Sequence, residues 1–213
     1  MENETKMSPK DEFISILKGI TRTGAQIDAL VEKLESTDFF QAPASTKYHG
    51  AFEGGLCVHC LNVYYNLMHL YKYKYGEELM WANKDSIAIV ALLHDMSKMN
   101  YYEPYFKNVK VYSPTGDKYD NGGKYYWDTQ KEYKTKDASD RFVFANHEMT
   151  SEYMVRQYIP LKVEESVAIL HHTGSTGWDS AQNNITEVYN KYPLASLLHC
   201  ADLMASYIDE RCY

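Results

Sequence analysis

Apolar side chains recur at intervals of three and four residues over most of this 213-residue sequence. That spacing places them along one face of an α-helix, whereas a strand would need strict alternation. The first stretch is interrupted by Gly19 and Gly24, which divide it into two short helices. The pattern predicts a mainly α fold with helices in residues 10–35, 56–70, 84–98, 147–159, 163–173 and 193–210.

Two segments depart from this pattern. Between Tyr101 and Asp140 the sequence alternates, is rich in Tyr, Val and Thr, and carries Gly and Asn at turn positions. These features predict a small β-hairpin or three-stranded sheet inserted around 101–140. Residues 36–55 show no periodicity, and a loop of that length inside a compact domain is commonly functional.

The length fits one medium-sized domain, and no repeat or low-complexity linker divides the chain. We therefore expect a single domain over 1–213. Its parts would be N-terminal helices (1–36), a functional loop (37–55), helices (56–100), the β insertion (101–140) and the remaining helices (141–213).

Charge and hydropathy restrict the partners and the location. The sequence has 22 Lys and Arg residues and 29 Asp and Glu residues, which gives a net charge of −7. Such a surface repels phosphates unless its charge is very unevenly distributed, so duplex nucleic acid is not an expected partner. No apolar run approaches 18 residues, and the polar, acidic N-terminus resembles neither a signal nor a transit peptide. We expect a cytoplasmic protein without a membrane partner.

The cysteines are expected to be reduced thiols in that compartment. Cys57 and Cys60 form a C-x-x-C pair, which is half of a typical structural zinc site. Cys200 and Cys212 are too far apart in sequence to supply a matching close pair. Structural zinc is the less favoured interpretation.

Histidines and aspartates interrupt the apolar helical stripes at a few positions. A polar group in such a stripe is costly to bury without partners, and carboxylates meeting imidazoles are well neutralised by a divalent cation. At a helix end, an adjacent His-Asp pair can bind one metal and bridge to a second, as in two-metal phosphate hydrolysis. The candidate ligands are His59, His94, Asp95, His147, His171, His172 and Asp202.

The order of these residues, H…HD…H…H…D, resembles the HD-domain superfamily of metal-dependent phosphohydrolases and phosphodiesterases. The segment HDMSK (94–98) is similar to the HD-x-x-K motif of that superfamily. The segment GGLCVHCLNV (54–63) is similar to one found in HD-type 3′→5′ exoribonucleases and in an uncharacterised HD family of bacteria and phages. The resemblance covers about residues 37–210 and implies an all-helical core of at least five helices.

The chain also departs from two relatives. It has neither the length nor the basic charge for the nucleic-acid-binding module of the exoribonucleases. HHTGSTGWDS (171–180) replaces the GYP-type motif of the cyclic-di-GMP phosphodiesterases, so that activity is not favoured. Alignment on the Thr-Gly that follows favours His172 over His171 as the ligand.

The resemblance implies a binuclear centre. His59, His94, Asp95 and Asp202 would hold one divalent metal, and Asp95 would bridge to a second one held by His147 and His172. Nitrogen-rich ligation favours Fe, Mn, Zn or Ni over Mg. Asp95 and Lys98 are the predicted catalytic residues, and Lys98 and His49 are the predicted contacts to substrate.

The predicted function is hydrolysis of a phosphoester in a nucleotide or related small phosphorylated molecule. The alternatives are a 3′→5′ phosphodiesterase on short or cyclic oligonucleotides and a non-catalytic HD module that senses a nucleotide. The sequence does not predict the oligomeric state. Weaker expectations concern side chains outside the motif: Glu53, Lys47 and Arg141 as substrate contacts, His199 as a residue that orients Asp202 or simply packs, and His69 as exposed.

Overall fold

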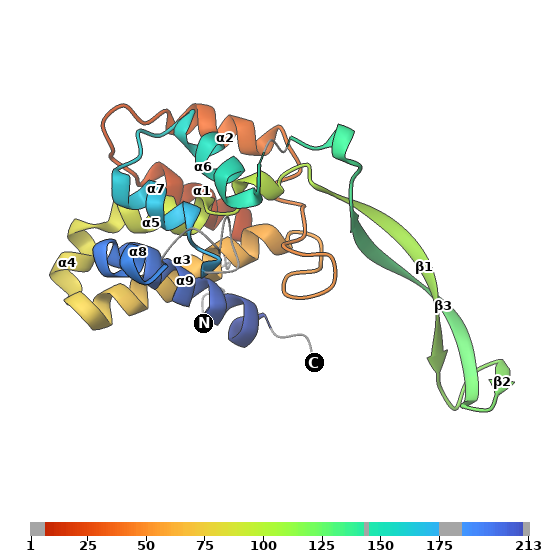
Figure 1. Cartoon of the computed structure of the whole chain (residues 1–213). Helices are drawn as coiled ribbons and strands as arrows, with labels where there is room; N and C mark the ends of the chain where they lie inside the picture. The colour runs from red at the N-terminus through yellow and green to blue at the C-terminus, as the bar shows by residue number, and fades with distance from the viewer. Residues whose placement is uncertain (1–6, 143–144, 175–184, 211–213) are drawn as a thin grey trace, which may run out of the picture.

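The computed structural model describes residues 7–142, 145–174 and 185–210, and they form a helical body with one projecting β arm (Figure 1). The helices are α1 (Pro9–Lys18), α2 (Ile27–Glu35), α3 (Gly55–Tyr75), α4 (Glu77–Ala82), α5 (Lys84–Leu93), α6 (His147–Arg156), α7 (Val163–Leu170), α8 (Ile185–Lys191) and α9 (Pro193–Met204). Short 3₁₀ turns span Met96–Lys98 and Ala138–Asp140, and a π-helical segment, Ala205–Asp209, continues α9. The mainly helical prediction is confirmed.

Helix α5 is the centre of the body. Every residue from Ser86 to Leu93 is buried, as expected for a helix that is apolar on all sides. Helix α3 packs against both α5 and α9, and α9 also packs against α7 (Figure 1). The start of α3 and the end of α5 lie in the interior, where any polar side chain is removed from water.

Several helices end earlier than the periodicity predicts. The helix expected over 84–98 stops at Leu93, and a turn and a short 3₁₀ segment follow. The reason is tertiary, because Ser97 donates through its backbone to Ser151 and through its hydroxyl to the carbonyl of His147. The helices expected over 147–159 and 163–173 end at Arg156 and Leu170, and the structure adds α4 and α8, which the sequence did not predict.

The predicted β insertion is confirmed as an antiparallel sheet with strand order β1-β3-β2. Its strands are β1 (Tyr102–Tyr112), β2 (Lys118–Asp120) and β3 (Gly123–Thr135). Figure 1 shows β1 and β3 as a long twisted hairpin that extends away from the helices, with β2 at its far end. We call residues 102–135 the arm.

The loop before α3 is well packed although it has no regular structure. Phe39 and Phe40 are buried against Phe13 of α1, with ring centroids 5.2–5.6 Å apart. A Cβ at Gly55 would lie 2.0 Å from the carbonyl oxygen of Gly50, so the loop closes on itself at a point that only glycine allows. The loop thereby holds residues 44–50 beside the start of α3.

Two cysteines belong to the core. Cys57 and Cys60 are buried on α3, and burial raises the pKa of the Cys57 thiol to about 12. Cys200 is exposed, and Cys212 lies outside the described residues. Among the residues that the structure describes, no cysteine belongs to a potential metal-binding group, and no helix has the length and apolarity needed to cross a membrane.

Candidate metal centre

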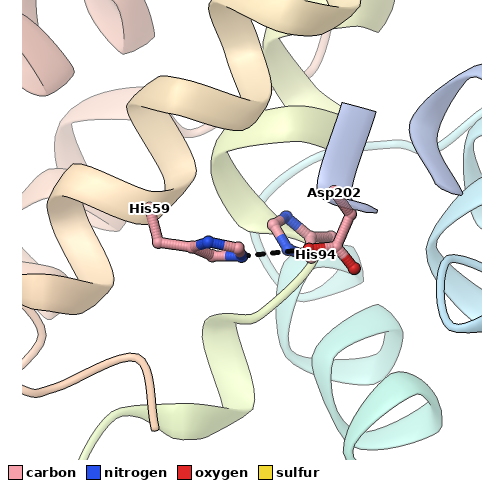
Figure 2. A group of neighbouring side chains, drawn as sticks. All are labelled: His59, His94 and Asp202. Carbon is pink, nitrogen blue, oxygen red and sulfur yellow. Dashed lines mark ion pairs between the residues drawn. The ribbon is translucent and has the colours of Figure 1, made fainter. Parts of the chain in front are cut away.

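Four helices bring polar side chains to one buried point. His59 lies on the second turn of α3, the pair His94-Asp95 follows α5, His172 follows α7, and Asp202 lies on α9. Figure 2 shows His59, His94 and Asp202 converging from their three elements. His59 and His94 are fully buried, Asp95 and His172 are 2% and 1% exposed, and Asp202 is partly exposed.

Asp95 is the centre of this cluster. Its Oδ2 atom lies 3.4 Å from His94 Nε2 and 3.7 Å from His59 Nε2, and its Oδ1 atom lies 3.7 Å from His172 Nε2. Asp202 Oδ1 is 3.2 Å from His59 Nε2. Two sets of residues could therefore each hold a metal ion. One set is His59, His94 and Asp202, the other is His94, Asp95 and His172, and within each set the potential ligand atoms all lie within 4.8 Å of one another.

Backbone carbonyl groups fix the orientation of two of the imidazoles. Nδ1 of His94 lies 2.9 Å from the carbonyl oxygen of Ala91, and Nδ1 of His172 lies 2.8 Å from that of Ile169. A carbonyl oxygen only accepts, so each Nδ1 must donate its proton. In the neutral ring Nε2 is then the lone-pair nitrogen, and it faces Asp95 as a metal ligand would.

His59 is oriented by a carboxylate. Its Nδ1 lies 3.1 Å from Glu210 Oε1, which also accepts from the side-chain amide of Asn62. Burial alone would lower the pKa of His59, but the carboxylates of Asp202 and Glu210 raise it to about 9. The two carboxylates therefore favour a positive charge here, and a bound cation would replace the second imidazole proton.

Unpartnered polar atoms test whether a metal fits this arrangement. His94 Nε2 and Asp95 Oδ1 are buried and form no hydrogen bond, and the buried His59 Nε2 has only the ion-pair contact with Asp202 at 3.2 Å. Buried polar groups are nearly always satisfied, because an unsatisfied one costs about 1–3 kcal/mol. All three residues belong to the two sets of potential ligands, so cations bound by these sets would satisfy the atoms.

The charges of the cluster suit the same ligand. Burial by itself would raise the pKa of Asp95, but Lys98 and His94 hold it well below its usual value. Burial, together with the neighbouring His94, lowers the pKa of His172 to about 3. At neutral pH Asp95 is therefore a carboxylate and His172 a neutral imidazole, which are the protonation states that bind metals.

A pocket of about 200 Å³ opens above the cluster. Lys98 lines it and places its ammonium 2.6 Å from Asp95 Oδ2. His49 also lines it, and its ring centroid is 5.0 Å from that of His59. Both predicted substrate contacts therefore lie at the pocket, together with Asp95, His147, His172 and Asp202.

His147 is at the edge of the cluster. Its ring centroid lies 5.2 Å from that of His172, but its side chain is 37% exposed and it belongs to neither set of ligand atoms. His171 does not line the pocket and is only partly buried. Of the two adjacent histidines, the structure places His172 at the cluster.

Of the weaker candidates, only His199 lines the pocket. Lys47 is exposed, Glu53 pairs with Lys131 of the arm, and Arg141 donates to the hydroxyl of Tyr101. His199 does not orient Asp202, because its Nδ1 atom lies 2.5 Å from the carbonyl oxygen of His172. His69 is exposed, as expected.

Two glutamates beside the cluster were not predicted from the sequence. Glu210 contacts His59, and the buried Glu148 lies 3.2 Å from His147 Nδ1 and accepts from Thr173. Glu148 directly follows His147, so an adjacent His-Glu pair at a helix start was an available signal. No local signal marked Glu210, which reaches His59 only because α9 packs against α3.

Comparison with protein-family models, curated proteins and solved structures finds no match to this chain. The geometry of the site is therefore the guide to its chemistry: His59, His94 and His172 surround Asp95, and a pocket lined by Lys98 lies above them.

Proposed function

We propose that this protein is a metal-dependent phosphohydrolase that cleaves a phosphoester of a nucleotide or a related small phosphorylated molecule. The observation that carries the proposal is the set of buried, unpartnered ligand atoms on His59, His94 and Asp95 below a pocket lined by Lys98. No simple packing role explains two such imidazoles turned toward one carboxylate.

The residues that would hold the metal are His59, His94, Asp95, His172 and Asp202. When bound, a transition metal would supply a lowered pKa for water and neutralise charge on phosphate oxygens. Three nitrogen ligands and two carboxylates favour Fe, Mn, Zn or Ni over Mg. The two sets of ligand atoms share His94, so they offer overlapping positions around Asp95.

The protein's own residues would position the substrate. Lys98 is held by Asp95, which raises the pKa of the ammonium above its usual value despite burial, so Lys98 stays charged beside the pocket. A charged ammonium there would bind a phosphate oxygen and stabilise negative charge in the transition state. His49, on the loop beside His59, lines the same pocket and would also contact the substrate. A pocket of about 200 Å³ suits a small molecule better than a long polymer.

The first experiment measures bound metal by elemental analysis and hydrolysis of a nucleotide panel with Mn²⁺ and Fe²⁺. Asp95→Asn keeps the side-chain shape but removes the charge of a ligand in one of the two sets, and we expect a lower content of bound metal and at least about a 100-fold loss of hydrolysis. His69→Gln changes an exposed histidine on the same helix as His59 and should leave both unchanged. Full turnover by Asp95→Asn would contradict the proposal, as would nucleotide binding by the metal-loaded wild type without hydrolysis.

Lys98→Gln separates substrate binding from metal binding. We expect unchanged metal content, and about a 10-fold or greater rise in KM, because a hydrogen bond to a charged group is lost. A loss of metal in this variant would instead assign Lys98 to the support of Asp95.

A further inference from the structure

The arm has two chemically different faces. In the register of β1 and β3, Lys110 pairs with Trp127 and Tyr112 pairs with Tyr125, so these side chains share one face. Lys118 of β2 pairs with Tyr125 and joins the same face. We call this the aromatic face and define it by Phe106, Lys110, Tyr112, Lys118, Tyr125 and Trp127.

The excess positive charge of the arm lies on this face. Its lysines are Lys110, Lys118 and, nearer the body, Lys131, and its acidic residue is Asp120. The opposite face carries three lysines and three acidic residues, several of them paired across the strands: Glu103, Lys107, Lys124, Asp128, Glu132 and Lys134. The chain as a whole is acidic, so the aromatic face is a local reversal of its charge.

Large aromatic side chains stand exposed on this face. Phe106 is 71% exposed, Tyr112 52% and Trp127 50%. Within the part of the chain that the structure describes, no helix packs extensively against the strands, and Figure 1 shows the arm free of the body along most of its length. An exposed cluster of this kind marks an interaction surface, and a sheet this small gains stability from a partner.

The lysines are available to a ligand. Lys118 makes no ion pair with any described residue, whereas Lys110 pairs with Asp120 and Lys131 with Glu53. Pairs this exposed contribute little stability, so a phosphate can replace the carboxylate. The Lys110 ammonium also lies 4.3 Å from the centroid of the Tyr125 ring, which keeps it among the aromatic side chains.

We propose that the aromatic face of the arm binds single-stranded nucleic acid. Unpaired bases stack on exposed aromatic rings while lysines contact the phosphates. Binding of this kind does not depend on the base sequence. The half-exposed ring of Trp127 packs edge-to-face against Tyr125, with ring centroids 6.1 Å apart, so Tyr125 holds Trp127 in place to stack on a base. A duplex keeps its bases stacked internally and would lose these contacts. The proposal does not depend on hydrolysis at the metal centre.

The test uses adjacent residues that point to opposite faces. The full chain is titrated into fluorescein-labelled oligo(dT) and oligo(U) of about 12 nucleotides, and anisotropy gives Kd. We expect Trp127→Ala to raise Kd about fivefold or more, the loss of one stacked base, and Tyr126→Ala, also exposed but on the other face, to change it less than about twofold. Circular dichroism checks that both variants fold, and a gel checks that the probe stays intact.

Salt dependence tests the lysines separately. Lys118→Gln should reduce the slope of log Kd against log salt by about 0.7, the value for one phosphate contact to a single strand. Equal effects of Trp127→Ala and Tyr126→Ala would overturn the proposal, as would wild-type binding weaker than about 100 μM at low salt or tighter binding to a duplex of the same length. Self-association of the wild type that Trp127→Ala abolishes would also overturn it and assign the face to a second copy of this chain.

Discussion

The metal centre and the arm break the usual rules of burial in opposite ways. In the body, polar atoms of His59, His94 and Asp95 are buried without hydrogen-bond partners. On the arm, apolar rings such as Phe106 and Trp127 are exposed to water. Buried polar groups and exposed apolar patches are the informative exceptions in a folded chain. The first exception supports the proposed metal site in the body, and the second supports the proposed binding surface on the arm.

A second buried charge in the body shows what a satisfied group looks like. Glu165 is fully buried, but both its oxygens accept from Arg22, and one also accepts from the backbone of Lys162. Burial alone would raise the pKa of Glu165. Its hydrogen-bond partners, above all Arg22, instead lower that pKa below 4.5. This carboxylate is satisfied by protein groups, whereas the Oδ1 atom of Asp95 has no hydrogen-bond partner.

The largest effect on stability should come from breaking that satisfied pair. Glu165→Gln leaves Arg22 without its charge partner and should lower the free energy of unfolding by about 3 kcal/mol, measured in urea at pH 7. Because the folded-state pKa of Glu165 is lowered, its contribution is present above pH 4.5 and is lost as the pH falls through the folded-state value. The variant should therefore lose less stability on acidification than the wild type.

Glu35→Gln is the matched control, because Glu35 pairs with Lys10 on the surface. Its stability should change by less than about 0.5 kcal/mol. Similar losses in the two variants would show that burial does not distinguish these pairs.

Metal should stabilise the body by a comparable amount. At a free concentration about 100 times its Kd, a bound metal raises the free energy of unfolding by about 2.7 kcal/mol. We expect Mn²⁺ or Zn²⁺ to raise the Tm of the wild type and a chelator to lower it. His94→Gln should abolish the response, because both sets of ligand atoms contain His94. An equal rise in that variant would place the bound metal elsewhere.

The loop between the two regions should show an intermediate effect. Gly55→Ala puts a Cβ 2.0 Å from the carbonyl oxygen of Gly50, so the loop that carries His49 must move. We expect a loss of about 1–3 kcal/mol in urea unfolding and weaker substrate binding. Gly19→Ala is the control, because Gly19 has an ordinary helical φ of −76°. Substrate binding unaffected by Gly55→Ala would separate the loop from the pocket.

The smallest effect on stability should come from the arm. Trp127→Ala removes a half-exposed ring outside the helical core, so the unfolding free energy should change by less than about 0.5 kcal/mol. A substantial loss in circular-dichroism melts would mean that the arm stabilises the body, and the contrast between the two regions would weaken.

The prediction of the fold from the sequence succeeded where one residue pattern persisted. The stripe of α3 and the alternation of the arm were long enough to identify a helix and a sheet. Helix ends were predicted poorly. Helix α5 ends at Leu93, shortly before Ser97 bonds to α6, and local periodicity carries no information about a contact with a segment about fifty residues away. The short helix α4, next to α3, had too few residues for a pattern of its own.

The candidate site divides in the same way. The residue types and their embedding in apolar stripes selected His59, His94, Asp95 and Asp202, the resemblance to the HD superfamily favoured His172 over His171, and the structure brings these five together. It leaves His147 at the edge and turns His199 to a backbone carbonyl, because those positions depend on the angles at which α6 and α9 pack. The role of Glu210 depends wholly on that packing.

The sequence by itself determined that the fold is mainly helical, where the sheet is inserted and which polar side chains interrupt the apolar stripes. Those properties depend on local periodicity, which a few consecutive residues encode. Only the tertiary structure decided which imidazole nitrogens face Asp95, which atoms are left unpartnered and that the arm separates a basic aromatic face from a neutral one. These depend on distances between residues far apart in the chain, and such distances arise only when the helices pack and the strands pair in register.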